Sequence, residues 1–295
     1  MFDKLTSILT DPPPAMAFEV SEAGIAAARI TARADLDFQP FRPGTLTVSP
    51  VKENVDDPDE FVMTVRSLSA TQAARKRKDV AIILPDYSAR ISVLDFDQFP
   101  SDPKEQSTLI RFRTKRSVPF DVDSAALSYH VQPGEKGRVD VVVVIAPLEI
   151  VSRYEAPFRT AGMNPGLVTM SSLAALELAP EKGLSVLAKL TGRVLTVLVR
   201  DKATLKLCRC VELPGTDLAD ISDVLIPTAI YIEDNFGRRA ENLLLCGFGP
   251  RTEEASQRFA EELSVECEPL RSPLGVPGEN NAGLLGYLRS IARNN

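Results

Sequence analysis

The clearest candidate for ligand chemistry is a glycine-rich loop near the C-terminal end of the chain. Residues 243–251 read LLLCGFGPR, and a charged stretch of helical character follows them. A strand that ends in Gly-x-Gly and continues into a helix is a common way for backbone amides to reach a phosphate. The loop around Gly247 and Gly249 therefore makes a nucleotide site the first hypothesis.

Other side chains that commonly perform catalysis are sparse. His130 is the only histidine; one is enough for a Ser-His-Asp triad, but nothing near it supports one, and a zinc site is not expected. The four cysteines include no Cys-x-x-Cys pair. Cys208 and Cys210 fall on one face of an expected strand and are most simply core thiols in a reducing compartment. The sequence predicts no metal site.

The composition is that of a globular protein. At 295 residues, with 44% hydrophobic and 25% charged residues, the chain has room for about two domains. A net charge of −6 disfavours a nucleic-acid partner, and the basic run 74–78 is best explained as a solvated helix end. No apolar run approaches 18 residues, and the N-terminus lacks a secretory pattern. Apolar residues within 2–9 share one helical face, which could pack on a membrane, a partner or this protein itself.

The apolar pattern predicts an α/β chain. Strands are expected at 17–20, 24–30, 44–48, 80–84, 89–94, 127–131, 139–145, 185–188, 192–199, 204–211 and 242–246. Helices are expected at about 56–68, 103–117, 148–161, 218–235 and 252–263. The strand-turn-strand openings at Ala17 and Ser185 indicate a duplicated α/β lobe.

An ordered series of motifs occupies the middle of the chain. It consists of Leu84-Pro85-Asp86, the step Val118-Pro119-Phe120-Asp121, Tyr129 in a strand, and Ala146-Pro147 leading into a helix that ends at Gly162. Together with LLLCGFGP and the later NNAGLLGYLRSI, these motifs run in an order and spacing that closely resembles the PilM family of type IV pilus assembly proteins. The resemblance covers most of the chain from Ala17 to Ile291.

The resemblance implies an actin-like fold close to that of FtsA. Two ribonuclease-H-like lobes would face a nucleotide cleft, and a small inserted β-α-β-β-α domain would replace one of actin's subdomains. The corresponding boundaries are 1–16 for an N-terminal segment, 17–88 and 164–183 for the first lobe, 89–163 for the inserted domain, and 184–295 for the second lobe.

The resemblance also implies a role. PilM proteins are cytoplasmic components of an inner-membrane platform and grip the short cytoplasmic tail of the membrane protein PilN, so that membrane contact is made through the partner. Pilus ATPases or other platform proteins are further possible partners, and no nucleic acid is expected. The type II secretion component GspL and MshI-type pilus proteins share this fold, which leaves a scaffold of another machine as an alternative.

The first phosphate hairpin of the family is degenerate in this sequence. Where the family has Asp-Ile-Gly-Ser-Ser-Ser followed by Lys, residues 19–26 have Glu19 for the Asp, Ser21 for the turn glycine and Ala26 for the Lys. Glu22 lies in the turn itself. Two like charges about 4 Å apart near a surface repel by about 4 kcal/mol, so this carboxylate would disfavour a triphosphate.

The second hairpin is degenerate as well. Counting back without gaps from Arg200-Asp201 places Ala188 at the family's Asp, Leu190 at its Gly and Val194 near its Thr. Ala188 offers no oxygen to magnesium, and Leu190 would hold the backbone away from a phosphate.

A cap subdomain of about sixty residues is also expected to be missing, because residues 211–220 lead almost directly into a helix. Phe248 replaces the middle glycine of the family's adenosine loop and would either fill the purine space or pack on the lobe. The vestigial positions therefore predict a pseudo-ATPase without cofactor; an active ATPase using Glu19 and the Gly247-x-Gly249 loop is the remaining alternative.

The resemblance places the partner groove between the first lobe and the inserted domain. Leu84, Pro85 and Ala89 are expected on one side and the end of the helix 103–117 on the other, where an extended tail could add backbone hydrogen bonds and fill apolar pockets.

The end of that helix offers two kinds of candidate. Pro119 and Phe120 could contact the tail or simply pack the helix end. Arg113 and Arg116, in the basic run that also includes Arg111 and Lys115, could attract an acidic tail or anionic lipid, or form a solvated face. Reversing Arg113 and Arg116 to Glu is expected to weaken tail or membrane binding without unfolding the protein.

Overall fold

The computed structural model describes residues 13–29, 35–71 and 79–294. The apolar face within 2–9 and the basic run 74–78 lie outside the described residues. Within the described part, no helix is long and apolar enough to cross a bilayer.

The first sheet is built around two strands that are buried on both faces. Its strands, in spatial order, are β3 (Asp35–Pro40), β2 (Gly24–Arg29), β1 (Met16–Ser21), β4 (Asp79–Leu84) and β8 (Asn164–Met170). Strand β2 is antiparallel to both β3 and β1. Strands β4 and β8 run parallel to β1. The continuous apolar run in β4 is typical of a strand covered on both sides.

The second sheet repeats this topology. Its order is β11 (Thr204–Glu212), β10 (Val194–Asp201), β9 (Leu184–Thr191), β12 (Asn242–Cys246) and β13 (Glu266–Pro269), with the same antiparallel and parallel relations. The expected duplication is confirmed. Only residues 213–217 join β11 to the next helix, so no cap subdomain is present between them.

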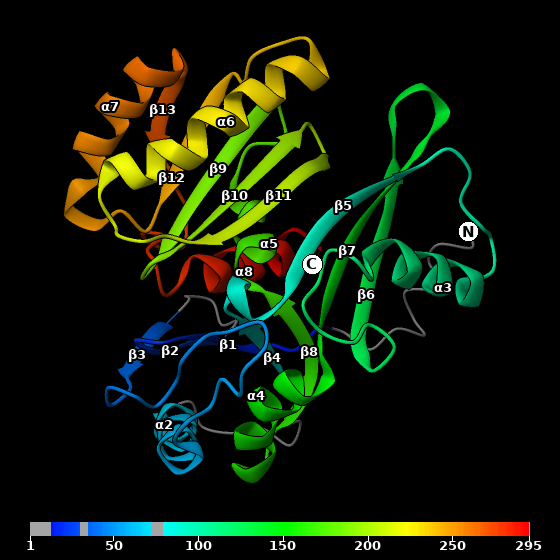
Figure 1. Ribbon diagram of the computed structural model, residues 1–295. Coiled ribbons are helices and arrows are strands. Elements are labelled where there is room, and N and C mark those ends of the chain that lie inside the picture. The colour runs from blue at the N-terminus through cyan, green and yellow to red at the C-terminus, as the bar shows by residue number, and fades with distance from the viewer. Residues whose placement is uncertain (1–12, 30–34, 72–78, 295) are drawn as a thin grey trace.

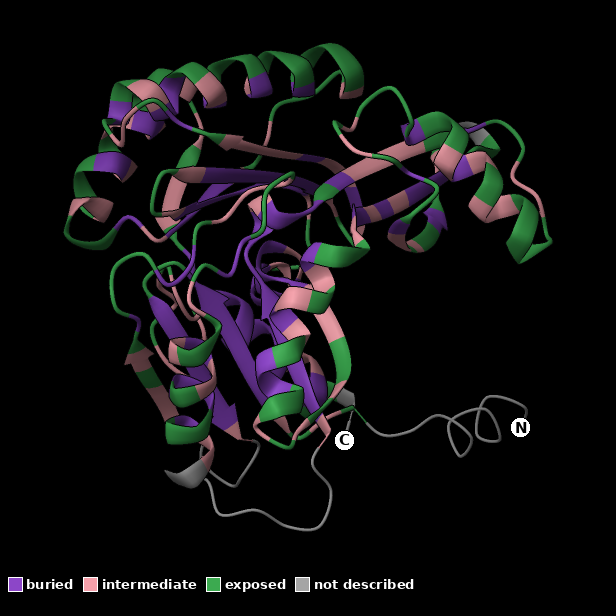
Figure 2. Cartoon of the chain, turned by 60° about the horizontal axis from the view of Figure 1, so that its bottom comes forward, coloured by how far each residue is buried: buried purple, intermediate pink, exposed green. Residues whose placement is uncertain are grey.

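Helices cover both sheets and fill the space between them (Figure 1). The outer face of the first sheet carries α2 (Pro58–Thr71) and α4 (Leu148–Thr160), and that of the second carries α6 (Leu218–Phe236) and α7 (Thr252–Leu263). Between the sheets lie α5 (Ser171–Ala175) and α8 (Ala282–Asn294). Short 3-10 turns occur at η1 (Asp86–Ser88), η2 (Glu135–Gly137), η3 (Leu176–Leu178) and η4 (Gly249–Arg251). The strands are mostly buried, whereas the outer helices expose one side to solvent (Figure 2).

A third sheet forms the inserted domain. It consists of β5 (Arg90–Phe96), β7 (Val139–Pro147) and β6 (Ala125–Pro133), in this order, and α3 (Pro103–Thr114) covers one of its faces. The insert is tied to edge strand β11 of the second lobe: the Lys206 ammonium lies 2.8 Å from the Asp140 carboxylate, and the Gln132 side chain bonds the backbone of Leu205.

Two helices pack on a different part of the molecule from the one to which the sequence boundaries assign them. Phe158 on α4, within 89–163, packs edge-on against Phe18 of β1 with ring centroids 5.1 Å apart. Tyr287 on α8, within 184–295, donates a hydrogen bond to the Pro14 carbonyl. Both helices therefore complete the core of the first lobe, because each presents its apolar side to that sheet.

Some elements differ from the expectation. Residues 44–48 form no strand, and only a single bridge joins Leu46 to Val55. Strands β3, β8 and β13 and helix α8 are additional. Edge strands are short and half polar, so their periodicity is weak in the sequence.

Candidate functional site

Two equivalent β-hairpins face each other across the cleft between the lobes. The β1–β2 hairpin turns at Glu22-Ala23, and the β9–β10 hairpin turns at Gly192-Arg193. Residues of both hairpins line a cavity of about 600 Å³. This is where the resemblance places a nucleotide.

The strand register identifies which residues of the two hairpins correspond. Glu19 pairs with Ala26 on the neighbouring strand, two residues before its turn-closing pair. Lys189 pairs with Thr196 at the same distance from its own turn. Glu19 and Lys189 therefore occupy equivalent positions in the two lobes.

This register corrects the alignment of the second hairpin. The ungapped count put Ala188 and Leu190 at the positions that would face a nucleotide, but both side chains are buried in the core beneath α6 and α7. Successive side chains of a strand point to opposite faces, so a count that is wrong by one residue selects the wrong face. The residue that faces the first lobe is Lys189, the one charged residue of strand β9.

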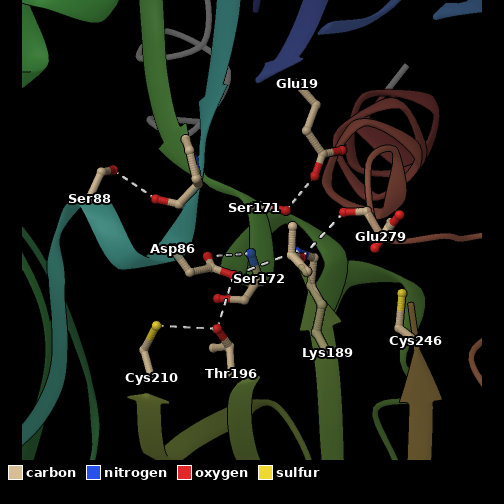
Figure 3. A network of polar contacts seen from close by, with 12 residues as sticks. Glu19, Asp86, Ser88, Ser171, Ser172, Lys189, Thr196, Cys210, Cys246 and Glu279 are labelled. Atoms are coloured by element: carbon tan, nitrogen blue, oxygen red, sulfur yellow. Dashed lines mark hydrogen bonds and ion pairs between the residues drawn. The ribbon is translucent and has the colours of Figure 1, made fainter. Parts of the chain in front are cut away.

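A buried ion pair connects the lobes at this point (Figure 3). The Lys189 ammonium lies 3.7 Å from the Asp86 carboxylate and donates to the Thr191 hydroxyl at 2.7 Å. Lys189 is only 2% exposed and Asp86 only 5%. The other contacts of Asp86 are the Ser172 amide at 2.8 Å and the Thr196 hydroxyl at 3.2 Å. Asp86 therefore has one partner in α5 and two in the second sheet.

Glu19 belongs to the same network. Its carboxylate accepts hydrogen bonds from the Ser171 hydroxyl and, at 2.7 Å, from the Leu284 amide in the first turn of α8. Burial raises the pKa of Glu19, and nearby Lys189 and these two hydrogen bonds offset the rise only in part. The native fold thus favours the protonated form of Glu19 more than the unfolded chain does.

The ammonium of Lys189 is held in its charged form. Burial lowers the pKa of Lys189, but the carboxylates of Asp86 and Glu19 outweigh burial, so that the net direction is upward. The site therefore contains a permanent cation that the protein itself supplies.

This set of groups suits Mg²⁺-ATP poorly. Magnesium is held by carboxylates and waters, usually together with substrate phosphates. Here the buried carboxylates of Asp86 and Glu19 already have protein partners, and a metal ion beside Lys189 would meet a like charge. Among the described residues, no group of three or more His, Cys, Asp or Glu side chains could hold a metal ion.

The remaining positions of the first hairpin are also occupied by protein contacts. The Glu22 carboxylate lies at the mouth of the cavity and accepts a hydrogen bond from the Val48 amide at 2.6 Å. Ala26, where the family has Lys, packs in the apolar cluster beneath α8. Glu22 therefore fixes the loop of residues 41–57 over the cleft.

The Gly-Phe-Gly loop lies beside a second cavity of about 810 Å³, where the resemblance would place adenosine. Phe248 is 4% exposed and packs against Phe259 of α7, with ring centroids 6.1 Å apart. The phenyl ring therefore packs on the lobe and leaves the cavity open. Gly247 has φ +84°, and a Cβ there would lie 1.9 Å from the Leu190 carbonyl oxygen, whereas Gly249 (φ +54°) has open space around it.

A separate apolar groove lies between the first lobe and the inserted domain. Its volume is about 330 Å³, and Leu84 and Ala89 line it as expected. The rest of its lining comes from β6, β7, α4, β8 and α5. Its apolar members are Ala126, Leu127, Val142, Val144, Ala146, Val151, Val168, Met170 and Leu173, and its polar members are Ser128, Tyr129, His130 and Thr169. Strands β6 and β8 are the last strands of their sheets, and within the described residues no further strand pairs with their outer edges. Pro85 lines the interlobe cleft instead.

The candidates near α3 lie elsewhere. This helix covers the face of the insert sheet that carries Val141 and Val143, whereas Val142 and Val144 face the groove. Arg113 stacks over the Phe96 ring at 5.1 Å, and Phe120 packs with Val122. Arg116 and Pro119 are exposed. The structure therefore does not bring Arg113, Arg116, Pro119 and Phe120 together with Leu84 and Ala89.

Comparison with known proteins supports the architecture. No protein-family model matches the sequence, and no curated protein matches it significantly. Among solved structures, the chain is similar to the PilM-PilN type IV pilus biogenesis complex, with a TM-score of 0.74, 18% identity and coverage of 94% of this chain and 98% of that one.

Two further structures agree. The cytoplasmic domain of EpsL, an inner-membrane component of the type II secretion system of Vibrio cholerae, has a TM-score of 0.53, 14% identity and coverage of 95% and 94%. A protein from Bacteroides thetaiotaomicron with an actin-like ATPase fold and unknown function has a TM-score of 0.53, 12% identity and coverage of 92% and 94%. The chain therefore has the actin-like fold expected from its motifs, in the form found in the PilM-PilN complex.

Proposed function

We propose that this chain is a nucleotide-free actin-like scaffold of a type IV pilus assembly platform. In this role it would grip the cytoplasmic tail of a PilN-like inner-membrane protein and reach the membrane from the cytoplasmic side through that partner. The observation that carries the nucleotide-free part is the Lys189–Asp86 ion pair, which joins the two lobes.

In an actin-like ATPase the nucleotide and its metal lie between two acidic hairpins. Here Lys189 occupies the position equivalent to Glu19, and the ion pair that Lys189 forms with Asp86 is buried. An ion pair within the protein then connects the lobes without a ligand. The interlobe geometry would be fixed at all nucleotide concentrations, as a static scaffold requires.

The test of this part is direct binding. Isothermal titration of the purified protein with ATP and Mg²⁺ is expected to give no heat of binding, and phosphate-release assays no turnover above buffer. Micromolar binding, or hydrolysis that disappears on mutating Asp86, would instead support an active ATPase.

The apolar groove supports the scaffold part of the proposal. It has room for a few side chains, and the outer edges of β6 and β8 offer backbone groups on either side. An extended apolar tail can add a strand to such an edge and place alternate side chains in the pocket. The likeness to a structure containing PilM and PilN is in keeping with this assignment.

A groove-filling substitution tests the tail site. Ser128 is exposed on β6 and pairs across the ladder with Val144, so Ser128→Trp would place a large ring in the groove. We expect at least about tenfold weaker binding of a synthetic peptide with the cytoplasmic tail sequence of a PilN-like protein from the same organism. Val131→Trp is the matched control, since Val131 is exposed on the same strand but lies outside the groove.

Equal loss of peptide binding in both variants, or unchanged peptide binding by Ser128→Trp, would show that the tail does not bind in this groove.

A second candidate is the corresponding scaffold of a type II secretion system, which the likeness to the EpsL cytoplasmic domain favours. Preferential binding of a tail peptide from a secretion component over the PilN-like peptide would select that alternative.

A further inference from the structure

The inserted domain carries a local charge opposite to that of the whole protein. Between Pro103 and Phe120 there are five basic side chains and a single acidic one, Glu105, although the chain as a whole has a net charge of −6. This segment is α3 together with its C-terminal extension. One of the five, Arg111, points inward and donates to the carbonyls of Val122 and Ala125, so it has a structural role.

The other four cations lie on the same helix, or in the turn at its end, as an exposed aromatic ring. Phe112 is 76% exposed, the largest exposed fraction of any aromatic side chain in the described part of the chain. Lys104, Arg113, Lys115 and Arg116 are exposed as well. Residues 104, 108 and 112 are four apart and so follow one side of α3, whereas Arg116 lies in the turn after the helix end.

These cations are not neutralised as other surface arginines are. Arg42, for example, pairs with Asp57 and Glu60, but no ion pair involves the four α3 cations among the described residues. The acidic residues beside these cations in the sequence are Asp102, which caps the start of α3 by accepting a hydrogen bond from the Glu105 amide, Glu105 in the first turn, and Asp121 beyond the helix end. The Asp121 carboxylate accepts hydrogen bonds from the amides of Asp123 and Ser124. Its interaction with Lys115 is a Coulomb attraction without an ion-pair contact.

From this arrangement we infer that the outer face of α3 binds directly to the surface of a membrane containing anionic lipids. The face presents one exposed ring and four exposed cations, of which Arg113 also stacks on Phe96, and it lies on the opposite side of the insert sheet from the apolar groove. A fluid layer of anionic headgroups can satisfy dispersed cations without a fixed geometry, and an aromatic side chain suits the headgroup boundary.

The inference adds a second membrane contact to the proposed scaffold, independent of the tail groove. Each lysine or arginine near an anionic surface strengthens binding about fivefold, so four of them with one inserted ring give weak, salt-sensitive attachment. The face would then orient the scaffold relative to the bilayer, while the tail would provide specificity.

The experiment is co-sedimentation of the full-length protein, without any tail peptide, with vesicles. Vesicles of 30% phosphatidylglycerol in phosphatidylcholine are compared with pure phosphatidylcholine at 0.1 M salt. We expect binding to the anionic vesicles only and a large loss at 0.5 M salt, where the screening length is much shorter. The double variant Lys115→Gln/Arg116→Gln should weaken vesicle binding about 25-fold. Adding Phe112→Ala to this double variant should weaken vesicle binding further.

The matched control is Arg238→Gln/Arg239→Gln, which changes the net charge equally at the end of α6, far from α3 in sequence and on another lobe. All variants alter exposed side chains, so an unchanged melting temperature confirms the fold. Absence of vesicle binding, or equal loss in the α3 and control variants, would overturn the inference. The inference would also be overturned if the α3 substitutions changed only the self-association of the protein, measured by sedimentation velocity without vesicles. Because no tail is present, none of these outcomes bears on the groove.

Discussion

The two lobes have the same strand order and opposite charges at equivalent positions. Glu19 in β1 and Lys189 in β9 each lie two residues before the last pair of their hairpins. The following strands correspond as well: β4 ends opposite Glu19 and continues into Leu84-Pro85-Asp86, whereas β12 ends opposite Lys189 and continues into the Gly-Phe-Gly loop. One lobe therefore contributes two carboxylates to the cleft and the other contributes the cation.

This difference shows that equivalent topology does not imply equivalent chemistry. Both hairpins keep the same backbone pairing, yet the buried charged groups Glu19, Asp86 and Lys189 bond to one another and to neighbouring protein groups. A buried ion pair is costly to desolvate and is retained only with good partners, which Ser172, Thr196 and Thr191 supply here.

The largest expected effect comes from removing the cation. Lys189→Met keeps the length of the side chain but leaves the carboxylates of Asp86 and Glu19 buried without compensation. We expect a loss of about 3–5 kcal/mol in the free energy of unfolding, measured by urea denaturation followed by circular dichroism. The variant Lys189→Met/Asp86→Asn/Glu19→Gln should regain most of that loss, since no charge then remains buried.

The control for this prediction is an exposed pair in the same sheet. Arg193 lies 2.7 Å from Glu212 and both are largely solvated, so Arg193→Ala should cost at most about 1 kcal/mol. A loss after Lys189→Met as small as that after Arg193→Ala would show that the buried pair does not hold the lobes together.

The second comparison is between the two glycines of the loop that follows β12. Gly247→Ala would force a methyl group against the Leu190 carbonyl at a positive φ, whereas Gly249→Ala meets only the positive φ. We expect losses of about 2–4 kcal/mol and about 1–2 kcal/mol, respectively. The measurement is again urea denaturation, in the absence of nucleotide. Equal losses would contradict a packing role specific to Gly247.

The smallest effect is a change in pH dependence. Because the native pKa of Glu19 is raised above 4.5, the native state binds more protons than the unfolded chain between these two values. Stability from this group is therefore fully present below pH 4.5 and is lost as the pH rises through the native pKa. Glu19→Gln removes this loss, so the stability of the variant relative to the native protein should increase from pH 4.5 towards neutrality. The measurement is thermal denaturation of both proteins over a series of pH values. A stability difference between variant and native protein that stays constant or decreases with pH would contradict a raised native pKa of Glu19.

Much of the fold followed from the sequence because its strongest patterns are local. The apolar runs of β4 and β7 and the strand-turn-strand openings predict buried strands without knowledge of their neighbours, and the motif order suggests the actin-like arrangement. The elements that were not predicted depend on distant contacts. Strand β8 is half exposed along its length and exists because it pairs with β4.

The site was predicted less completely, for a similar reason. The sequence marks Glu19, Glu22, Ala26 and Phe248 as departures from a nucleotide site, because each is a change of residue type within a recognisable motif. Lys189 escaped detection because an ungapped count along the chain does not establish the strand register, and a shift of one residue selects the opposite face of the strand.

The sequence by itself determined the α/β class and the duplicated lobes, since these depend on periodicity and on the order of local patterns. The departures at the phosphate-binding positions are predictions that depend on the resemblance to the PilM family. Only the tertiary structure decided that Lys189 meets Asp86 across the cleft, that Phe248 packs on its own lobe, and that α3 and the apolar groove lie on opposite faces of the insert. Each of these depends on the direction of a side chain from a surface formed by segments far apart in the chain. That direction is fixed by strand register and by packing between the layers.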